Sequence, residues 1–270
     1  KSAEPNKQTD MLPILTRLTE KLEHEDFFLE LLSKEIGVET SDILDYEFYI
    51  YNCEKGTFWG LEEEFYSSPR LDNLTSVEAC VSGILSASCQ GRKDDTISLI
   101  ALYDNEEVGS RTKQGAASAA IDRIMEKLYL ALGFSRDQYL SAIFKSFLLS
   151  MDVAHAYHPA KPNNYDPKNR SLLGDGVVIK MSSTQTYATD STAVSVLEEL
   201  CREHKIPYKK FSNRSDIRGG STLGSISSCA LAVKAADVGV GLLAMHSAME
   251  TMGAADQWAL NSLVKAFFED

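Results

Sequence analysis

The spacing of apolar residues along the chain predicts helices in several stretches. Apolar positions recur at helical intervals over residues 12–36, where they indicate two helices, and over 116–132, 136–149, 190–206 and 254–268. Another helix is expected from about Thr75, because Thr75 and Glu78 have the spacing of an N-terminal capping box.

Shorter apolar runs between these helices have the length and the β-branched content of strands. They cover residues 43–52, 96–103, 148–156, 176–182, 207–211 and 236–247. Loops are expected over residues 56–74, 158–175 and the glycine-rich 218–227. Because strands and helices alternate, the sequence predicts an α/β fold in which a mostly parallel mixed sheet is sandwiched by helices.

Two adjacent acids stand at the end of one predicted strand. The stretch "TISLIALYDNEEVGS", residues 96–110, passes from apolar residues to Glu106 and Glu107. Neighbouring side chains of a regular strand point to opposite faces, so both glutamates reach one site only if the backbone turns there. Asn105 and Gly109 give the segment the composition of such a turn.

Other acids and a histidine also follow apolar segments. Asp72 precedes a predicted helix, Asp152 closes "LLSM", and His246 closes "VGVGLLAM". Ligands in open α/β sheets bind beyond the carboxyl ends of strands, and oxygen and imidazole donors suit zinc, manganese or cobalt. A carboxylate can bridge two such ions, and a spare carboxylate can then act as the general base. We therefore expect one of the two glutamates to bind metal and the other to be the base.

Each of these residues also has an ordinary interpretation. Asp72 alone could cap its helix, Asp104 has a local role of that kind, and a single histidine such as His246 is more often a satisfied polar residue than a ligand. Only the conjunction of all the positions favours a metal site.

Composition excludes some classes of partner. The 270 residues contain 39 acidic and 27 basic side chains, a net charge of −12, which argues against nucleic acid as the main partner. Five cysteines without a CxxC pair indicate a reducing compartment, so we expect a cytoplasmic protein. No apolar run has the length of a membrane span.

Several motifs, in order, resemble those of the metal aminopeptidases that include aspartyl aminopeptidase and the vacuolar aminopeptidase I. They are "SSPRLDNL", "LYDNEEVGS", "SMDVAHAYHP", "GVVIKMSSTQTYA", "RGGSTLG" and "AMHSAMET". The resemblance runs from about residue 9 to the C-terminus, and it implies a zinc exopeptidase fold with two zinc ions in a complete site. It also implies a homo-oligomer built from dimers, as large as twelve subunits in the family.

The resemblance implies roles for the candidate residues. Asp72 would bridge the ions, Glu107 and His246 would complete the ligands of one ion, Asp152 would bind the other, and Glu106 would be the general base. In related dinuclear sites the bridging aspartate is commonly followed by an unusual backbone, so we expect strain between Asp72 and Asn73, of which a cis peptide bond is one form.

The same resemblance places three residues against the peptide substrate. His155 and Lys180 match positions that line the family's substrate pocket, and Gly220 lies in the "GGSTLG" loop, where glycine lets backbone approach a ligand. The "SDIRGGSTLG" loop is closer to the non-aspartyl branch, which favours neutral over acidic N-terminal residues.

One family motif has no counterpart here. The family supplies another metal-binding histidine from a "GAHTDSP"-like motif, and His24, among charges in a predicted helix, is a poor substitute. The resemblance makes residues 1–55 the end of an inserted dimerisation domain and 56–270 a catalytic domain without its N-terminal segment. We expect that segment to come from the same polypeptide or a second chain, and the chain alone to have weak or no catalysis.

The sequence thus predicts a dinuclear zinc aminopeptidase. One alternative is a catalytically incomplete relative that acts as an assembly or peptide-binding module. Another is a metal-dependent amidase or deacylase.

Overall fold

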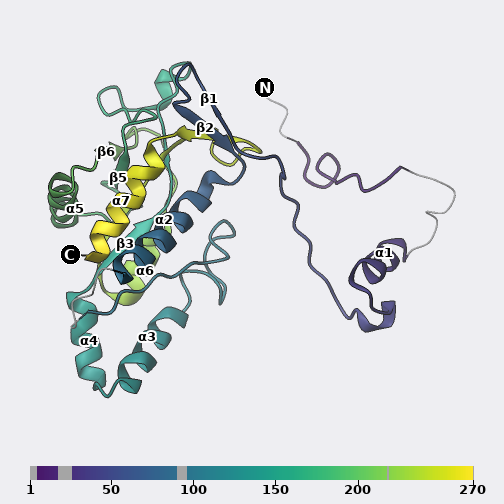
Figure 1. The fold of residues 1–270 in the computed structure, drawn as a ribbon, viewed down its shortest axis with the longest axis horizontal. Coiled ribbons are helices and arrows are strands. Elements are labelled where there is room, and N and C mark those ends of the chain that lie inside the picture. The colour runs from purple at the N-terminus through teal and green to yellow at the C-terminus, as the bar shows by residue number, and fades with distance from the viewer. Residues whose placement is uncertain (1–4, 18–25, 90–95, 218, 270) are drawn as a thin grey trace. The chain divides into compact units, whose positions relative to one another are not determined.

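The computed structural model describes residues 5–17, 26–89, 96–217 and 219–269. The chain divides into two compact units, residues 1–51 and 52–270. Figure 1 draws both units, whose positions relative to one another are not determined.

The first unit contains one α-helix and one short 3-10 helix among its described residues. Helix α1 covers Phe27–Ile36, and η1 covers Thr40–Asp42. The second of the two helices predicted over residues 12–36 is therefore present, residues 12–17 are not helical, and residues 18–25 lie outside the described residues.

The strand predicted over residues 43–52 does not form. Tyr46 and Phe48, two residues apart, both pack against Phe28. Their ring centroids lie 5.6 and 5.3 Å from the centroid of the Phe28 ring. No strand within the described part of the chain pairs with this segment, and Leu44 is 96% exposed. The apolar alternation favours an extended chain, but a strand also needs a hydrogen-bonded neighbour.

The described residues of the second unit form two mixed sheets, where the sequence predicted one. The strands of the first sheet, in spatial order, are β1 (Thr57–Trp59), β2 (Phe65–Ser68), β9 (Glu250–Gly253), β8 (Gly241–Leu243) and β4 (Ala154–His155). The second sheet contains β3 (Phe147–Met151), β7 (Lys234–Gly239), β5 (Val177–Met181) and β6 (Tyr208–Ser212). The pairs β3–β7 and β5–β6 are parallel, whereas β5–β7 is antiparallel.

The two sheets meet where β3 passes into β4 beside β7 and β8. Asp152 N donates to Val238 O and Ala154 N donates to Val240 O, so the parallel ladder continues across the junction. Asp152 therefore lies at the point where one sheet gives way to the other.

Helices cover both faces of the second sheet, as predicted. The helices of this unit are α2 (Leu71–Ser88), α3 (Ala120–Ala131), α4 (Arg136–Lys145), η2 (Pro162–Asn164), α5 (Ser191–Glu203), α6 (Leu223–Leu231) and α7 (Asp256–Glu269). Ala236 and Val238 of β7 belong to the core that includes residues of α5 and α7, and α2 packs alongside α7 (Figure 1). Asp237 points to the other face, where α6 lies against β3 and β7.

Three local predictions in this unit are wrong. Residues 96–103 form no strand, and Ile97 and Leu102 are 44% and 52% exposed, because no described strand pairs with them. Thr75 makes no capping box: it lies inside α2 and its hydroxyl donates to Leu71 O. The segments expected to be loops contain the β1–β2 hairpin and the start of α6.

None of the described helices is both long enough and apolar enough to cross a membrane.

Candidate metal centre

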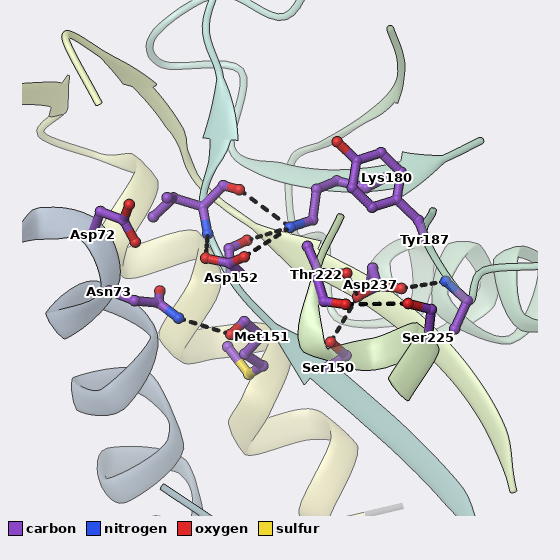
Figure 2. Close-up of polar contacts among 12 residues, drawn as sticks. Asp72, Asn73, Ser150, Met151, Asp152, Lys180, Tyr187, Thr222, Ser225 and Asp237 are labelled. Atoms are coloured by element: carbon purple, nitrogen blue, oxygen red, sulfur yellow. Dashed lines mark hydrogen bonds and ion pairs between the residues drawn. The ribbon is translucent and has the colours of Figure 1, made fainter. Parts of the chain in front are cut away.

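Asp72 lies in the first turn of α2, where the backbone departs from helical geometry. Asp72 and Asn73 have ψ angles of 107° and 33°, and the peptide bond between them is cis, as expected. The Asn73 amide donates to Met151 O at 2.9 Å, which ties the start of α2 to the end of β3 (Figure 2). The Asp72 side chain is 8% exposed.

The two adjacent glutamates lie in a turn, as the sequence predicted. Gly109 N donates to Glu106 O at 2.8 Å, and Ser110 N donates to Asn105 O at 2.9 Å. Gly109 has a φ of 101°, a conformation that residues other than glycine rarely adopt. Glu106 is half-buried, whereas the Glu107 side chain is 65% exposed.

The turn and the loop after β8 bring three predicted ligands together. His246 Nε2 lies 3.1 Å from Asp72 Oδ2 and 3.4 Å from Glu107 Oε1. One ligand atom from each of the three residues lies within 4.8 Å of the others. Tetrahedral zinc with ligands at about 2.1 Å separates its ligand atoms by about 3.4 Å. The spacing and the donor types therefore fit one zinc ion.

Asp152 lies near this group but is not part of the close triad. Its Oδ1 accepts a hydrogen bond from Val153 N at 2.8 Å, and its Oδ2 lies 3.9 Å from Lys180 Nζ. Figure 2 shows the Asp72 carboxylate directed toward Asp152. Asp152 therefore lies beside the triad without joining it.

The carboxylates of the cluster repel one another. Burial, together with the charges of Asp152, Glu107 and Glu250, raises the pKa of Asp72 to about 7. Burial and the charges of Asp152 and Glu107 also raise the pKa of Glu106. A cation among these groups would remove the repulsion, so the electrostatics and the geometry favour the same kind of ligand.

Lys180 is completely buried beside Asp152. Its ammonium donates to the backbone oxygens of Asp152 and Val153 at 3.0 and 3.1 Å, and it lies 5.3 Å from the centre of the Tyr187 ring (Figure 2). Burial lowers the pKa of Lys180. In this arrangement Lys180 holds the backbone that carries Asp152.

The other predicted residues are less closely tied to the triad. His155 ends β4 with an exposed side chain, and Gly220 is exposed with open space where a Cβ would lie. His24 lies outside the described residues. A pocket of about 360 Å³ is lined by Arg70, Asp72, Glu107, His246, Ser247 and Glu250.

Two buried carboxylates near the site were not selected from the sequence. Glu250 accepts hydrogen bonds from the backbone N–H groups of Asp72 and His246. Asp237 is opposite Lys180 in the β5–β7 register and accepts from Ser150 Oγ at 2.6 Å and from Thr222 Oγ1 (Figure 2). The sequence did contain one signal for Asp237, which is an acid inside the apolar strand "AADVGVG". A carboxylate buried in this way requires several hydrogen-bond donors around it.

Comparison with known proteins gives the family of this chain. A model of the family described as aminopeptidase I zinc metalloprotease (M18) matches residues 1–268. Probable M18 family aminopeptidase 2 of Clostridium acetobutylicum is 39% identical over 263 residues, which are 97% of this chain and 60% of that protein. Aspartyl aminopeptidase 4 of Saccharomyces cerevisiae is 38% identical over 256 residues, 91% of this chain and 52% of that protein.

Solved structures agree with this result. The chain matches one in the cryo-EM structure of the Ape4 and Nbr1 complex with a TM-score of 0.85 and 29% identity, covering 97% of this chain and 51% of that one. Yeast aminopeptidase 1 matches with a TM-score of 0.79 and 25% identity, over 90% and 54% of the two chains.

The fold and the acid–imidazole cluster are thus those of a metallopeptidase-like α/β protein. The chain belongs to the M18 family of zinc metalloproteases. It spans between about half and 60% of the length of these curated relatives.

Proposed function

We propose that this chain carries most of the active site of a dinuclear zinc aminopeptidase, which releases single residues from the N-termini of peptides. The observation that carries the proposal is the convergence of Asp72, Glu107 and His246 at the spacing of tetrahedral zinc ligands. Membership of a zinc metalloprotease family supports the choice of zinc over manganese or cobalt.

Four side chains would hold the two ions. Asp72, Glu107 and His246 would hold one ion, and Asp72 and Asp152 would hold the other. The buried Lys180 keeps the backbone of Asp152 in place through its two carbonyl contacts. The resemblance also implies a histidine ligand for the second ion. In this proposal that histidine comes from a segment outside residues 1–270.

Bound zinc would lower the pKa of a water molecule and polarise the scissile carbonyl. Glu106 is the residue left to move the proton. It is half-buried, its pKa is raised, and it is adjacent in sequence to the ligand Glu107. Glu106 takes the proton from the attacking water and then gives it to the leaving amine.

The substrate is a peptide whose free α-amine lies against the acidic cluster. The pocket of about 360 Å³ beside the triad has room for one amino-acid residue. His155, Lys180 and Gly220 are proposed to line or support the substrate pocket. Both neutral and acidic N-terminal residues are candidates, since relatives carry the names of general and of aspartyl aminopeptidases.

We also propose that the protein works as a homo-oligomer. A structure similar to this chain is the S. cerevisiae mApe1 dodecamer, with a TM-score of 0.78 and 25% identity. In this proposal residues 1–55 belong to a dimerisation domain. The predicted cytoplasmic location stays a prediction.

The test measures zinc and activity together. Zinc affinity is determined by competition with a chromogenic chelator, and hydrolysis is followed with aspartyl-, glutamyl-, leucyl- and alanyl-anilides and with N-acetyl amino acids. His246→Ala should lower zinc affinity at least 10-fold and reduce hydrolysis accordingly, because it removes one ligand. His204→Ala is the matched control, because His204 follows α5 and lies outside the triad.

The outcomes separate the candidate functions. Zinc binding with hydrolysis of aminoacyl-anilides supports the aminopeptidase. Hydrolysis of only the N-acetyl compounds would replace the aminopeptidase with a deacylase. The assembly module would be favoured if the protein, together with the complementary N-terminal segment, bound zinc or peptide without hydrolysing any substrate.

A further inference from the structure

Glu250 is a buried carboxylate at the edge of the proposed metal centre. It is the first residue of β9, pairs with Ser68 of β2, and is 2% exposed. A buried carboxylate is costly unless it is hydrogen-bonded, so its partners indicate why it is there.

Each oxygen of Glu250 accepts a hydrogen bond from the backbone of a proposed zinc ligand. Oε2 accepts from Asp72 N at 2.9 Å, and Oε1 accepts from His246 N at 2.7 Å. Asp72 is on α2, whereas His246 is in the loop after β8, so one side chain joins two separate segments at the point where their ligands meet.

The contact to His246 fixes an uncommon backbone. His246 has a φ of 66°, in the left-handed region that residues other than glycine seldom adopt. Its imidazole reaches Asp72 and Glu107 from this conformation. The hydrogen bond from its N–H to Glu250 is therefore a restraint on the direction of the ligand.

We propose that Glu250 is a positioning residue that holds the backbones of Asp72 and His246 so that both side chains converge on one zinc ion. The inference rests on the proposed function, because it concerns the ligands of that site. Glu250 uses both of its carboxylate oxygens on these two backbone N–H groups and acts on the ion through the ligands. Partners of this kind contribute about 10–100-fold to metal affinity in metalloproteins.

Glu250→Gln is the sharpest variant. Glutamine has nearly the same shape, but only one of its two terminal atoms is an acceptor, whereas both partners are N–H donors. One of the two hydrogen bonds must therefore be lost. We expect the zinc dissociation constant to rise about 10–100-fold, with hydrolysis restored by excess zinc.

The chain offers a matched control. Asp256 at the start of α7 is 1% exposed and likewise accepts two backbone hydrogen bonds, from Gly174 N and Gly176 N, both at 2.9 Å. Asp256→Asn loses the same kind of contact but touches no proposed ligand. It should leave the zinc dissociation constant within about twofold, which is well below the effect on a ligand partner.

Zinc affinity of the three proteins is measured by chelator competition, and hydrogen exchange of the amides of residues 72 and 246 is measured without zinc. Faster exchange of at least one of these two amides and weaker zinc binding in Glu250→Gln alone support the proposal. If Glu250→Gln does not fold, Glu250→Asp, which keeps the charge but is one methylene shorter, replaces it.

Equal zinc affinity in Glu250→Gln and the unsubstituted protein would overturn the positioning role while leaving the proposed function intact. Equal losses in Glu250→Gln and Asp256→Asn would also overturn it, since the effect would then be one of general stability. Failure of the unsubstituted protein to bind zinc would overturn the proposed function and this inference together.

Discussion

At the scale of single residues, the two neighbouring glutamates of the proposed site have different surroundings. Glu107 is exposed and lies 3.4 Å from His246 Nε2, whereas Glu106 is half-buried and has a raised pKa. A raised pKa suits a group that must take and return a proton near neutral pH. The turn at Gly109 is what allows two adjacent side chains to approach the same cluster of charges.

Glu106→Gln should separate binding from catalysis. Glutamine keeps the shape of the side chain but cannot accept a proton, so kcat should fall by about 10²–10⁴-fold or more. Zinc stoichiometry and affinity should be unchanged, as measured by chelator competition. Glu107→Gln is the control, and it should lower zinc affinity as well as rate. Wild-type turnover by Glu106→Gln would remove Glu106 from the role of base.

Sequence reasoning at this scale found three residues that lie close together in the structure and missed the buried acids near them. Asp72, Glu107 and His246 were recognisable because polar residues of metal-binding type follow apolar runs. Glu250 and Asp237 make mostly long-range hydrogen bonds, to partners such as Asp72 N and Ser150 Oγ, which only the folded chain brings near. An acid in an apolar strand indicates that partners exist, but it does not identify them.

At the scale of elements, the contact between α2 and α7 fixes the helix that carries Asp72. Gly83 of α2 is buried against Val264 of α7. A Cβ at Gly83 would lie 2.6 Å from Val264 Cγ1 and 3.0 Å from the Val264 backbone carbon, which is too close for ordinary packing. The two helices approach this closely because residue 83 has no side chain.

Gly83→Ala should therefore be destabilising, although the same change in an open helix stabilises by about 1 kcal/mol. We expect a net loss of about 1–3 kcal/mol in the free energy of unfolding, because the helices must move apart. Urea denaturation measures the change. Introducing Gly83→Ala into Val264→Ala protein, where Cγ1 is absent, should cost less. A single Gly83→Ala variant as stable as the unsubstituted protein would contradict the packing argument.

The element predictions that held are those whose pattern is satisfied within a helix or by a strand that pairs with the segment, as β7 pairs with β3. Helix α5 formed over residues predicted to be helical, and its N-cap Asp190 accepts from Ala193 N. Residues 43–52 and 96–103 have strand-like composition but no described strand beside them. The short strand β1 was missed because its three residues are all exposed and carry no alternation of burial.

At the scale of the whole molecule, a buried acid makes global stability depend on pH. Burial raises the pKa of Asp256 to about 6 from 3.8, against the opposing effect of hydrogen bonds from Gly174 and Gly176. Between these two values the native state keeps a proton that the unfolded state has released. Stability therefore falls as the pH rises from about 4 to about 6, by about 3 kcal/mol in total, and levels off above that range.

Asp256→Asn should remove this part of the pH dependence. The free energy of unfolding of the unsubstituted protein minus that of the variant should decrease by about 2 kcal/mol between pH 4 and pH 7, because part of the titration of the unfolded chain lies below pH 4. Urea denaturation of both proteins with a chelator present is the measurement, so that the contribution of Asp72 is common to both and cancels. A difference that stays constant over this range would show that Asp256 titrates as it does in the unfolded chain.

The sequence by itself determined the α/β class, most helices and strands of the second unit, and the kinds of side chain that gather at strand ends. These follow from local periodicity and from chemistry that residue types carry with them. Only the tertiary structure decided that the sheet divides in two at Asp152, and that Asp72, Glu107 and His246 meet within 4.8 Å. It also decided that Glu250 joins two of them. The reason is that these contacts link residues far apart in the chain, and their geometry depends on the packing of every element between them.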